Sequence, residues 1–256
     1  MFRTFLVSIL FLSFFRTSVA ESKSSMDVSI DEKLGQQVAM DVILKDENAN
    51  DITLRRLIDK PTILIFNYFR CAGICPVLFS NLAEIVNRMQ LEPGKDYRLV
   101  AVSFDPTDTP EMAREKKANY LNQLRRRFPP DAWHFLTGTA KNTRTVADSA
   151  GFNYRPQKDM YVHPGAIIVL TPAGIISRYI NGTDFLAADV EMAIQEANSG
   201  EVRPTISKVL AFCYSYDPEG RAYVFSITRL MGTFTLVLVA VFIIFVLRGK
   251  TKQKRQ

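Results

Sequence analysis

The sequence predicts an α/β fold, a sandwich built around a mixed central sheet. A continuous apolar run is typical of a strand buried on both faces, and an apolar stripe at helical spacing follows it directly. Strand and helix patterns of this kind then alternate down to about residue 200, and one Thr-Pro-Ala-Gly turn indicates a hairpin. Together these observations favour a sheet with helices packed against it.

The first half of the alternation contains two strands and two helices. Residues 62–69 (TILIFNYF) are apolar, β-branched and aromatic, which predicts a buried strand. Residues 76–90 carry the helical stripe, and residues 98–104 (RLVAVSF) predict a second strand. Thr109-Pro110-Glu111 supplies a cap residue, a proline and an acid, so a helix should begin there and continue to about Leu124.

The second half predicts shorter elements and ends with an amphipathic helix. They are a strand at 133–136, a helix opened by Thr139 and ending near Gly151, strands at 166–170 and 175–180 around the hairpin turn, and a helix from about Leu186 that ends before Gly200. This order of elements is that of a thioredoxin-like fold.

The N-terminus has the pattern of a cleavable secretory signal. Arg3 precedes a mostly apolar run over residues 4–15, and Ser18 and Ala20 are small residues at the positions that precede a cleavage site. We expect cleavage after Ala20, with an uncleaved anchor as the alternative because Arg16 follows the run directly.

The C-terminus predicts one transmembrane helix. Residues 230–247 are an uncharged stretch of Leu, Val, Ile and Phe without a polar face, which argues against a buried core helix. The basic tail after it belongs on the cytoplasmic side, so the folded part should lie on the outer side of a bacterial cytoplasmic membrane. The predicted organisation is a signal peptide at 1–20, a flexible tether at 21–34, a thioredoxin-like domain at 35–200, a juxtamembrane appendix at 201–228, a transmembrane helix at 229–247 and a basic cytoplasmic tail at 248–256.

The distribution of charge argues against a nucleic-acid partner. The formal net charge is +6, but seven of the 32 Lys and Arg residues lie in the first twenty and last nine residues. The remaining 25 stand against 26 Asp and Glu, so the body of the protein is close to neutral. Binding to a phosphate backbone needs a clustered basic surface.

The chemistry is predicted to lie in Cys71-Ala72-Gly73-Ile74-Cys75-Pro76, between the buried strand and the helix after it. If both cysteines fall in the first helical turn, their spacing puts the two thiols on one face, within range of a disulfide. A helix N-terminus favours the thiolate form. Such a pair can cycle between dithiol and disulfide or hold a soft metal ion.

A static disulfide is the structural alternative for this pair. The loop it would close is very short, so it would stabilise the fold little. The motif also lies at the carboxyl end of a strand, where α/β sheets place their ligands.

His163 is the candidate third ligand, because it directly precedes the predicted strand at 166–170. Two thiolates and an imidazole suit Cu(I) and also accept Cu(II). Structural zinc normally takes four protein ligands, and a lone histidine in an apolar context is more often structural. His134 lies in a predicted strand and is interpreted as structural.

Several motifs together resemble the Sco/SenC family. They are the Cys-x-x-x-Cys-Pro motif after an apolar strand, Ser103-Phe104-Asp105-Pro106 with Asp108-Thr109-Pro110-Glu111, Trp133-His134-Phe135-Leu136-Thr137-Gly138, and His163 shortly before Val169-Leu170-Thr171-Pro172-Ala173-Gly174. Phe212-Cys213-Tyr214-Ser215-Tyr216-Asp217-Pro218 ahead of a C-terminal span is similar to a bacterial membrane-anchored branch.

The resemblance implies a thioredoxin-like copper chaperone outside the cytoplasmic membrane. Its copper ion, Cu(I) or Cu(II), would be held by Cys71, Cys75 and His163, and its partners would be the copper-centre subunit of cytochrome c oxidase and a copper donor protein. Ala72, Gly73 and Val162 depart from the family pattern, and Val162 replaces an acid that could orient the imidazole.

The alternative function is a thiol-disulfide oxidoreductase, with Cys71 and Cys75 as the redox pair reducing the cysteines of a partner protein. The longer Cys-x-x-x-Cys spacing favours metal binding, so a delivery protein is preferred over an enzyme. A peroxidase is unsupported, because Leu64 and Tyr68 stand where peroxiredoxins have Pro and Thr. Cys213 is interpreted as a buried thiol.

Overall fold

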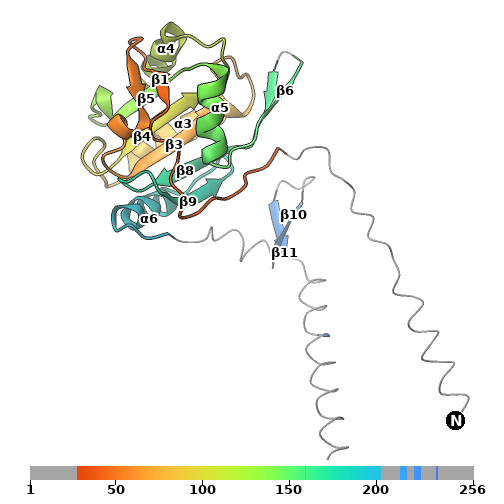
Figure 1. The fold of residues 1–256 in the computed structure, drawn as a ribbon. Coiled ribbons are helices and arrows are strands. Elements are labelled where there is room, and N and C mark those ends of the chain that lie inside the picture. The colour runs from red at the N-terminus through yellow and green to blue at the C-terminus, as the bar shows by residue number, and fades with distance from the viewer. Residues whose placement is uncertain (1–27, 159, 203–213, 218–221, 226–234, 236–256) are drawn as a thin grey trace, which may run out of the picture.

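The computed structural model describes residues 28–158, 160–202, 214–217, 222–225 and 235. Its centre is a five-stranded sheet with the order β5-β4-β3-β8-β9, which Figure 1 shows with helices packed around it. β3, β4 and β5 are parallel, whereas β8 is antiparallel to β3 and β9 is antiparallel to β8. The prediction of a mixed α/β fold is confirmed. The sheet strands are β3 (Thr62–Asn67), β4 (Arg98–Ser103), β5 (Trp133–Leu136), β8 (Ala166–Leu170) and β9 (Ile176–Asn181).

The strands form where the sequence is apolar without alternation, because both faces of the sheet are covered. All six residues of β3 and all five of β8 are buried. α3 contacts α4 and α6, while α5 contacts the short strand β1 (Ile43–Lys45). The helices are α3 (Ile74–Arg88), α4 (Pro110–Leu121), α5 (Ala140–Ser149) and α6 (Ala187–Asn198).

Two helix starts follow from their cap residues. Thr109 accepts a hydrogen bond from the backbone N–H of Met112 at 3.4 Å, with Pro110 in the first turn. Thr139 accepts one from the backbone N–H of Asn142 at 3.2 Å. Both predicted starts are confirmed. α4 ends at Leu121, three residues before the predicted Leu124, where the carbonyls of Ala118 and Tyr120 accept from the N–H of Asn122.

An aromatic stack joins α3 and α4 to the sheet. The Phe79 ring of α3 lies 4.8 Å from Tyr120 of α4 and 6.1 Å from Trp133 of β5, centroid to centroid. Phe135 of β5 lies 6.1 Å from Tyr120. Such rings bury large apolar areas, so this stack fixes how α4 sits beside α3.

Several short elements have no counterpart in the sequence-based prediction. They are β1, β2 (Asp51–Thr53), α2 (Leu54–Leu57), a 3-10 turn at Pro130–Ala132, and the β-hairpin of β6 (Arg155–Gln157) and β7 (Met160–Val162). Each is too short for its hydrophobic period to stand out. β10 (Tyr214–Asp217) and β11 (Ala222–Phe225) pair antiparallel within the predicted juxtamembrane appendix.

The N-terminal described residues lie against the domain. The backbone N–H of Asp31 donates to the carbonyl of Gly151 at 2.8 Å, and that of Lys33 donates to the Tyr179 hydroxyl at 3.0 Å. Both residues belong to the stretch that the sequence analysis assigns to the tether.

The predicted signal peptide (1–20) and basic tail (248–256) lie outside the described residues, as does the predicted transmembrane segment (229–247) apart from Thr235. Within the part of the chain that the structure describes, no helix combines the length and apolar character needed to span a bilayer.

Candidate metal centre

The two cysteines lie at the carboxyl end of β3, one on each side of a helix start. β3 ends at Asn67, Gly73 is the N-cap of α3, and Ile74 is its first residue. Cys75 is therefore in the first helical turn, whereas Cys71 lies in the preceding loop, where its N–H donates to the Tyr68 carbonyl at 3.2 Å. The condition that both cysteines fall in the first helical turn is therefore met by Cys75 and not by Cys71. Both are free thiols and buried, with 8% of Cys71 and 5% of Cys75 exposed.

The sheet topology brings His163 to the cysteines from 88 residues further along the chain. β8 pairs antiparallel with β3, with Leu64 opposite Ile168 and Thr62 opposite Leu170. The start of β8 therefore lies beside the end of β3, and the loop that enters β8 meets the loop that leaves β3. The close fit at Gly165 shows this contact, because a Cβ there would lie 2.7 Å from Cδ1 of Ile74.

The three predicted side chains come together. The Sγ atoms of Cys71 and Cys75 and a ring nitrogen of His163 all lie within 4.8 Å of one another. Cys75 Sγ lies 3.4 Å from His163 Nε2. This is a group of three soft donor atoms able to hold a metal ion.

The ring of His163 is oriented by the backbone. Nδ1 lies 3.0 Å from the carbonyl oxygen of Pro164, and since a carbonyl only accepts, Nδ1 carries the hydrogen. The Nε2 lone pair is then directed to the sulfurs. The Pro164 carbonyl therefore orients the imidazole. In the family pattern an acid at the position of Val162 could do so.

Aromatic rings pack around the imidazole of His163. Its centroid lies 5.3 Å from Phe104, 5.8 Å from Tyr68 and 6.1 Å from Phe152. Such packing limits the rotation of the ring and reduces its contact with water.

A buried acidic network fixes the loop that carries Cys71. Asp108 Oδ2 accepts from the N–H of Phe69 at 2.7 Å and from the Ser103 hydroxyl at 2.6 Å. Asp105 Oδ2 accepts from Arg70 Nη2 at 2.7 Å. Two residues directly before Cys71 are therefore anchored to the segment that follows β4. In the sequence, Asp105 and Asp108 contribute only to the family resemblance, and no local pattern predicts this anchoring role.

The two thiols have opposite acidities. A hydrogen bond from Cys75 to the Cys71 sulfur is the largest influence on Cys71 and lowers its pKa against the effect of burial. The pKa of Cys75 is raised, because its proton is shared with the Cys71 sulfur and because it is buried. Cys71 is therefore the more acidic of the two thiols, which favours it as the nucleophile in an exchange.

The other histidine and the third cysteine stand apart from this group. His134 lies in β5 with its Nδ1 3.6 Å from Glu47 Oε1, in a buried cluster that also holds Lys117. Its side chain is 14% exposed, in keeping with the structural interpretation. Cys213 lies outside the described residues.

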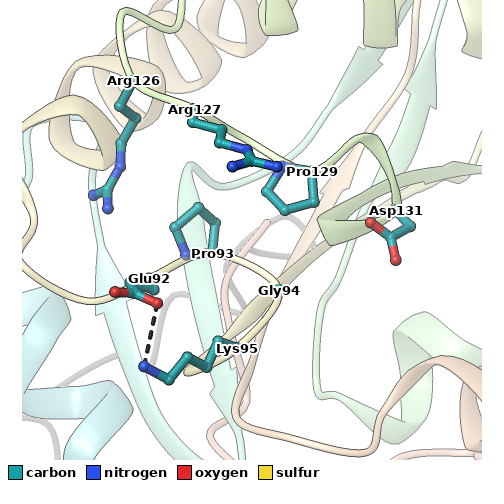
Figure 2. Close-up of a pocket in the computed structure, with 8 residues that line it drawn as sticks. All are labelled: Glu92, Pro93, Gly94, Lys95, Arg126, Arg127, Pro129 and Asp131. Carbon is teal, nitrogen blue, oxygen red and sulfur yellow. Dashed lines mark hydrogen bonds and ion pairs between the residues drawn. The ribbon is translucent and has the colours of Figure 1, made fainter.

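A wide cleft elsewhere in the domain contains none of the predicted site residues. Figure 2 shows this space, of about 640 Å³, between the turn around Gly94 and the segment from Arg126 to Asp131. These segments precede β4 and β5, whereas Cys71 follows the parallel strand β3, so cleft and cysteines are at opposite ends of the sheet. Arg126 donates hydrogen bonds to the carbonyls of Val86 and Met89, and Lys95 forms an ion pair with Glu92. Size alone does not make this cleft the functional site.

Fold and site together define a thioredoxin-like protein with a dithiol-imidazole group at the carboxyl end of its parallel strands. A model of the SCO1/SenC family matches residues 31–197. The chain belongs to the SCO1/SenC family.

Individual relatives agree with this membership. A Stutzerimonas stutzeri protein, provisionally named as copper-binding, is 25% identical over 143 residues, which span 54% of this chain and 66%, just under two thirds, of that protein. A crystal structure of an Aquifex aeolicus VF5 protein provisionally assigned to electron transfer is 27% identical, with a TM-score of 0.59 over 66% of this chain and 95% of that one. Arabidopsis thaliana ScoI with copper bound shares the fold at 22% identity, with a TM-score of 0.52 over 61% of this chain and 96% of its own.

Proposed function

We propose that this protein binds one copper ion through Cys71, Cys75 and His163 and delivers it to a partner protein. The observation that carries the proposal is the meeting of two thiols and an imidazole nitrogen within 4.8 Å. Membership of a family with copper-binding relatives supports the choice of metal.

The donor set fits Cu(I). Metal–sulfur and metal–nitrogen bonds of about 2.0–2.3 Å in a trigonal arrangement separate the donors by about 4 Å. The three donors already lie within an ångström of that separation. Soft thiolates prefer Cu(I), while the described residues add no fourth ligand to this group of the kind that structural zinc requires.

The proposal predicts binding of one copper ion to the reduced protein. Titration with Cu(I) against a chromophoric chelator should give one ion per chain, and Cys71→Ser, Cys75→Ser or His163→Ala should each weaken binding by more than about a hundredfold. Removing a metal ligand should lower the affinity more than removing a group that hydrogen-bonds to a ligand, which lowers it about 10- to 100-fold. Cys213→Ser is the matched control and should bind as wild type. Unchanged affinity in His163→Ala would remove the imidazole from the site.

The lowered pKa of Cys71 and the raised pKa of Cys75 favour a second candidate function, that of a thiol-disulfide oxidoreductase. A thiolate at Cys71 beside a protonated Cys75 is the arrangement with which exchange begins. The two functions are compatible, because a dithiol copper site on a partner must be reduced before it is loaded. Ready reduction of a partner disulfide by a protein that does not retain copper would favour this candidate.

We further propose that the partner is the copper-centre subunit of cytochrome c oxidase, loaded outside the cytoplasmic membrane by a chain anchored through its C-terminal apolar segment. The support is family membership, the signal-like N-terminus and the basic residues after 247. A deletion strain should lose oxidase activity at low copper and regain it with added copper. Rescue by an added reductant and not by copper would point to the oxidoreductase.

A further inference from the structure

A small cavity adjoins the cysteines where α4 passes the start of α3. It measures about 10 Å³, close to the volume that one water needs, and both Cys71 and Cys75 line it. Lys116 and Tyr120 of α4 and Asn67 of β3 also line it. α4 therefore contributes one basic residue, Lys116, to the lining of the cavity that both cysteines share.

The register of α4 places Lys116 there. Ala113 and Tyr120 are the buried residues of α4, and Lys116 follows the first by three positions and precedes the second by four. All three share the face of the helix that packs inward. Tyr120 stacks on Phe79 at 4.8 Å, which fixes this face of α4 against α3, and Lys116 lines the cavity there together with Cys75.

Lys116 lines the same cavity as both thiols, and it forms no ion pair with an acidic side chain of the described residues. Its neighbour Lys117 is paired with the buried carboxylate of Glu47. Lys116 is half-buried, so its charge is screened less than that of an exposed lysine.

We propose that Lys116 is a positioning residue whose positive charge stabilises the anionic forms of the Cys71–Cys75 pair. Two thiolates around one Cu(I) carry a net charge of −1, and the ammonium in the adjoining cavity balances it. The same charge favours the reduced, thiolate-bearing pair over the neutral disulfide. The copper part of this inference rests on the proposed function, whereas the redox part needs only the two cysteines.

The redox part is tested by equilibrating the full chain with glutathione. Oxidation forms one S–S bond between Cys71 and Cys75 while glutathione disulfide is cleaved to two glutathione thiols, so electrons and protons balance. Lys116→Gln should raise the equilibrium constant for this oxidation by about three- to tenfold, because the reduced pair loses a nearby cation. A tenfold change corresponds to about 30 mV. Lys116→Arg, which keeps the charge, should restore a value near that of wild type.

Arg114→Gln is the matched control, because it removes one positive charge from an exposed position of the same helix. It should leave the constant unchanged. Lys116→Met keeps an apolar stem and should behave like Lys116→Gln, which separates charge from packing. Equal constants for wild type, Lys116→Gln and Lys116→Met would overturn the inference, as would an equal shift in Arg114→Gln.

Cu(I) competition on the same variants tests the copper part, with an affinity for Lys116→Gln about three- to tenfold below wild type. If wild type fails to bind copper, the proposed function fails while the glutathione result still decides the role of Lys116. If wild type binds copper and Lys116→Gln binds it equally well, the charge-balance argument is wrong for the copper complex.

Discussion

Asp108 is expected to hold the Cys71 loop in place, and its removal should cost both stability and metal affinity. Its Oδ2 accepts two short, buried hydrogen bonds, from the Phe69 N–H and the Ser103 hydroxyl. Asp108→Ala removes both and leaves the Phe69 N–H buried without a partner. Hydrogen bonds to charged groups contribute about 1.5–3 kcal/mol each, and an orphaned buried donor costs about 1–3 kcal/mol. Burial raises the pKa of Asp108, so part of the stabilisation from these hydrogen bonds offsets the cost of removing the carboxylate from water.

We therefore expect Asp108→Ala to lower the free energy of unfolding by about 3 kcal/mol. Urea unfolding followed by circular dichroism measures this loss, and Cu(I) competition measures the accompanying loss of affinity. Asp108→Asn keeps an acceptor oxygen for Phe69 and should lose less. Copper binding should fall in the same order as stability, because Phe69 is two residues from Cys71.

Asp41→Ala is the control for this comparison. Asp41 pairs with Arg55 on the surface, with 74% of its side chain exposed, so its loss should leave the unfolding midpoint nearly unchanged. If Asp108→Ala unfolds at the same urea concentration as Asp41→Ala and binds copper as wild type does, the anchoring argument is refuted.

Two further predictions concern groups remote from the cysteines. Burial raises the pKa of Glu47, but the nearby His134 ring and the hydrogen-bonded ammonium of Lys117 more than offset this and lower it to about 2. Because the folded pKa lies below the unfolded value of 4.5, this stabilisation is present above about pH 4.5 and lost as the pH falls towards 2. As the pH falls across this range, the free energy of unfolding measured with urea should decrease by up to about 3 kcal/mol less in Glu47→Gln than in wild type. An equal decrease in both proteins would contradict this. Tyr179→Phe removes a hydroxyl that donates to the Ala150 carbonyl at 2.9 Å and accepts from the Lys33 N–H at 3.0 Å. It should cost about 1–2 kcal/mol and speed amide exchange at Lys33, and unchanged exchange at that amide would argue against the contact.

The regular elements follow from the sequence where local signals are strong. The stretch Thr62–Asn67 is apolar throughout because both its faces are covered, and Thr109 and Thr139 cap helices through their own side chains. β1 and β2 have no such signal, because a strand of three residues is too short to show a hydrophobic period. The turn between them does have a local cause, because Asp46 Oδ1 accepts from the N–H groups of Asn48 and Asn50 at 2.8 Å each.

The candidate site was predictable in its residue types and less so in its geometry. Cysteine spacing cannot tell whether a helix begins before Cys71 or after it; the helix begins at Ile74, which leaves Cys71 in the loop. The approach of His163 depends on the antiparallel pairing of β8 with β3, a long-range choice that no local pattern encodes. Lys116 was missed because its role comes from packing of α4 against α3, and a lysine in a polar helix resembles a solvated one.

The aromatic stack also places an intrinsic fluorescent probe close to the cysteines. Trp133 is the one tryptophan in the sequence, and its ring stacks on Phe79, which lines the cavity beside both thiols. Tryptophan emission therefore comes from a single indole, which one ring separates from the cavity that both cysteines line. Excited selectively over the tyrosines, this emission should follow changes at the thiols without a dye or a tag.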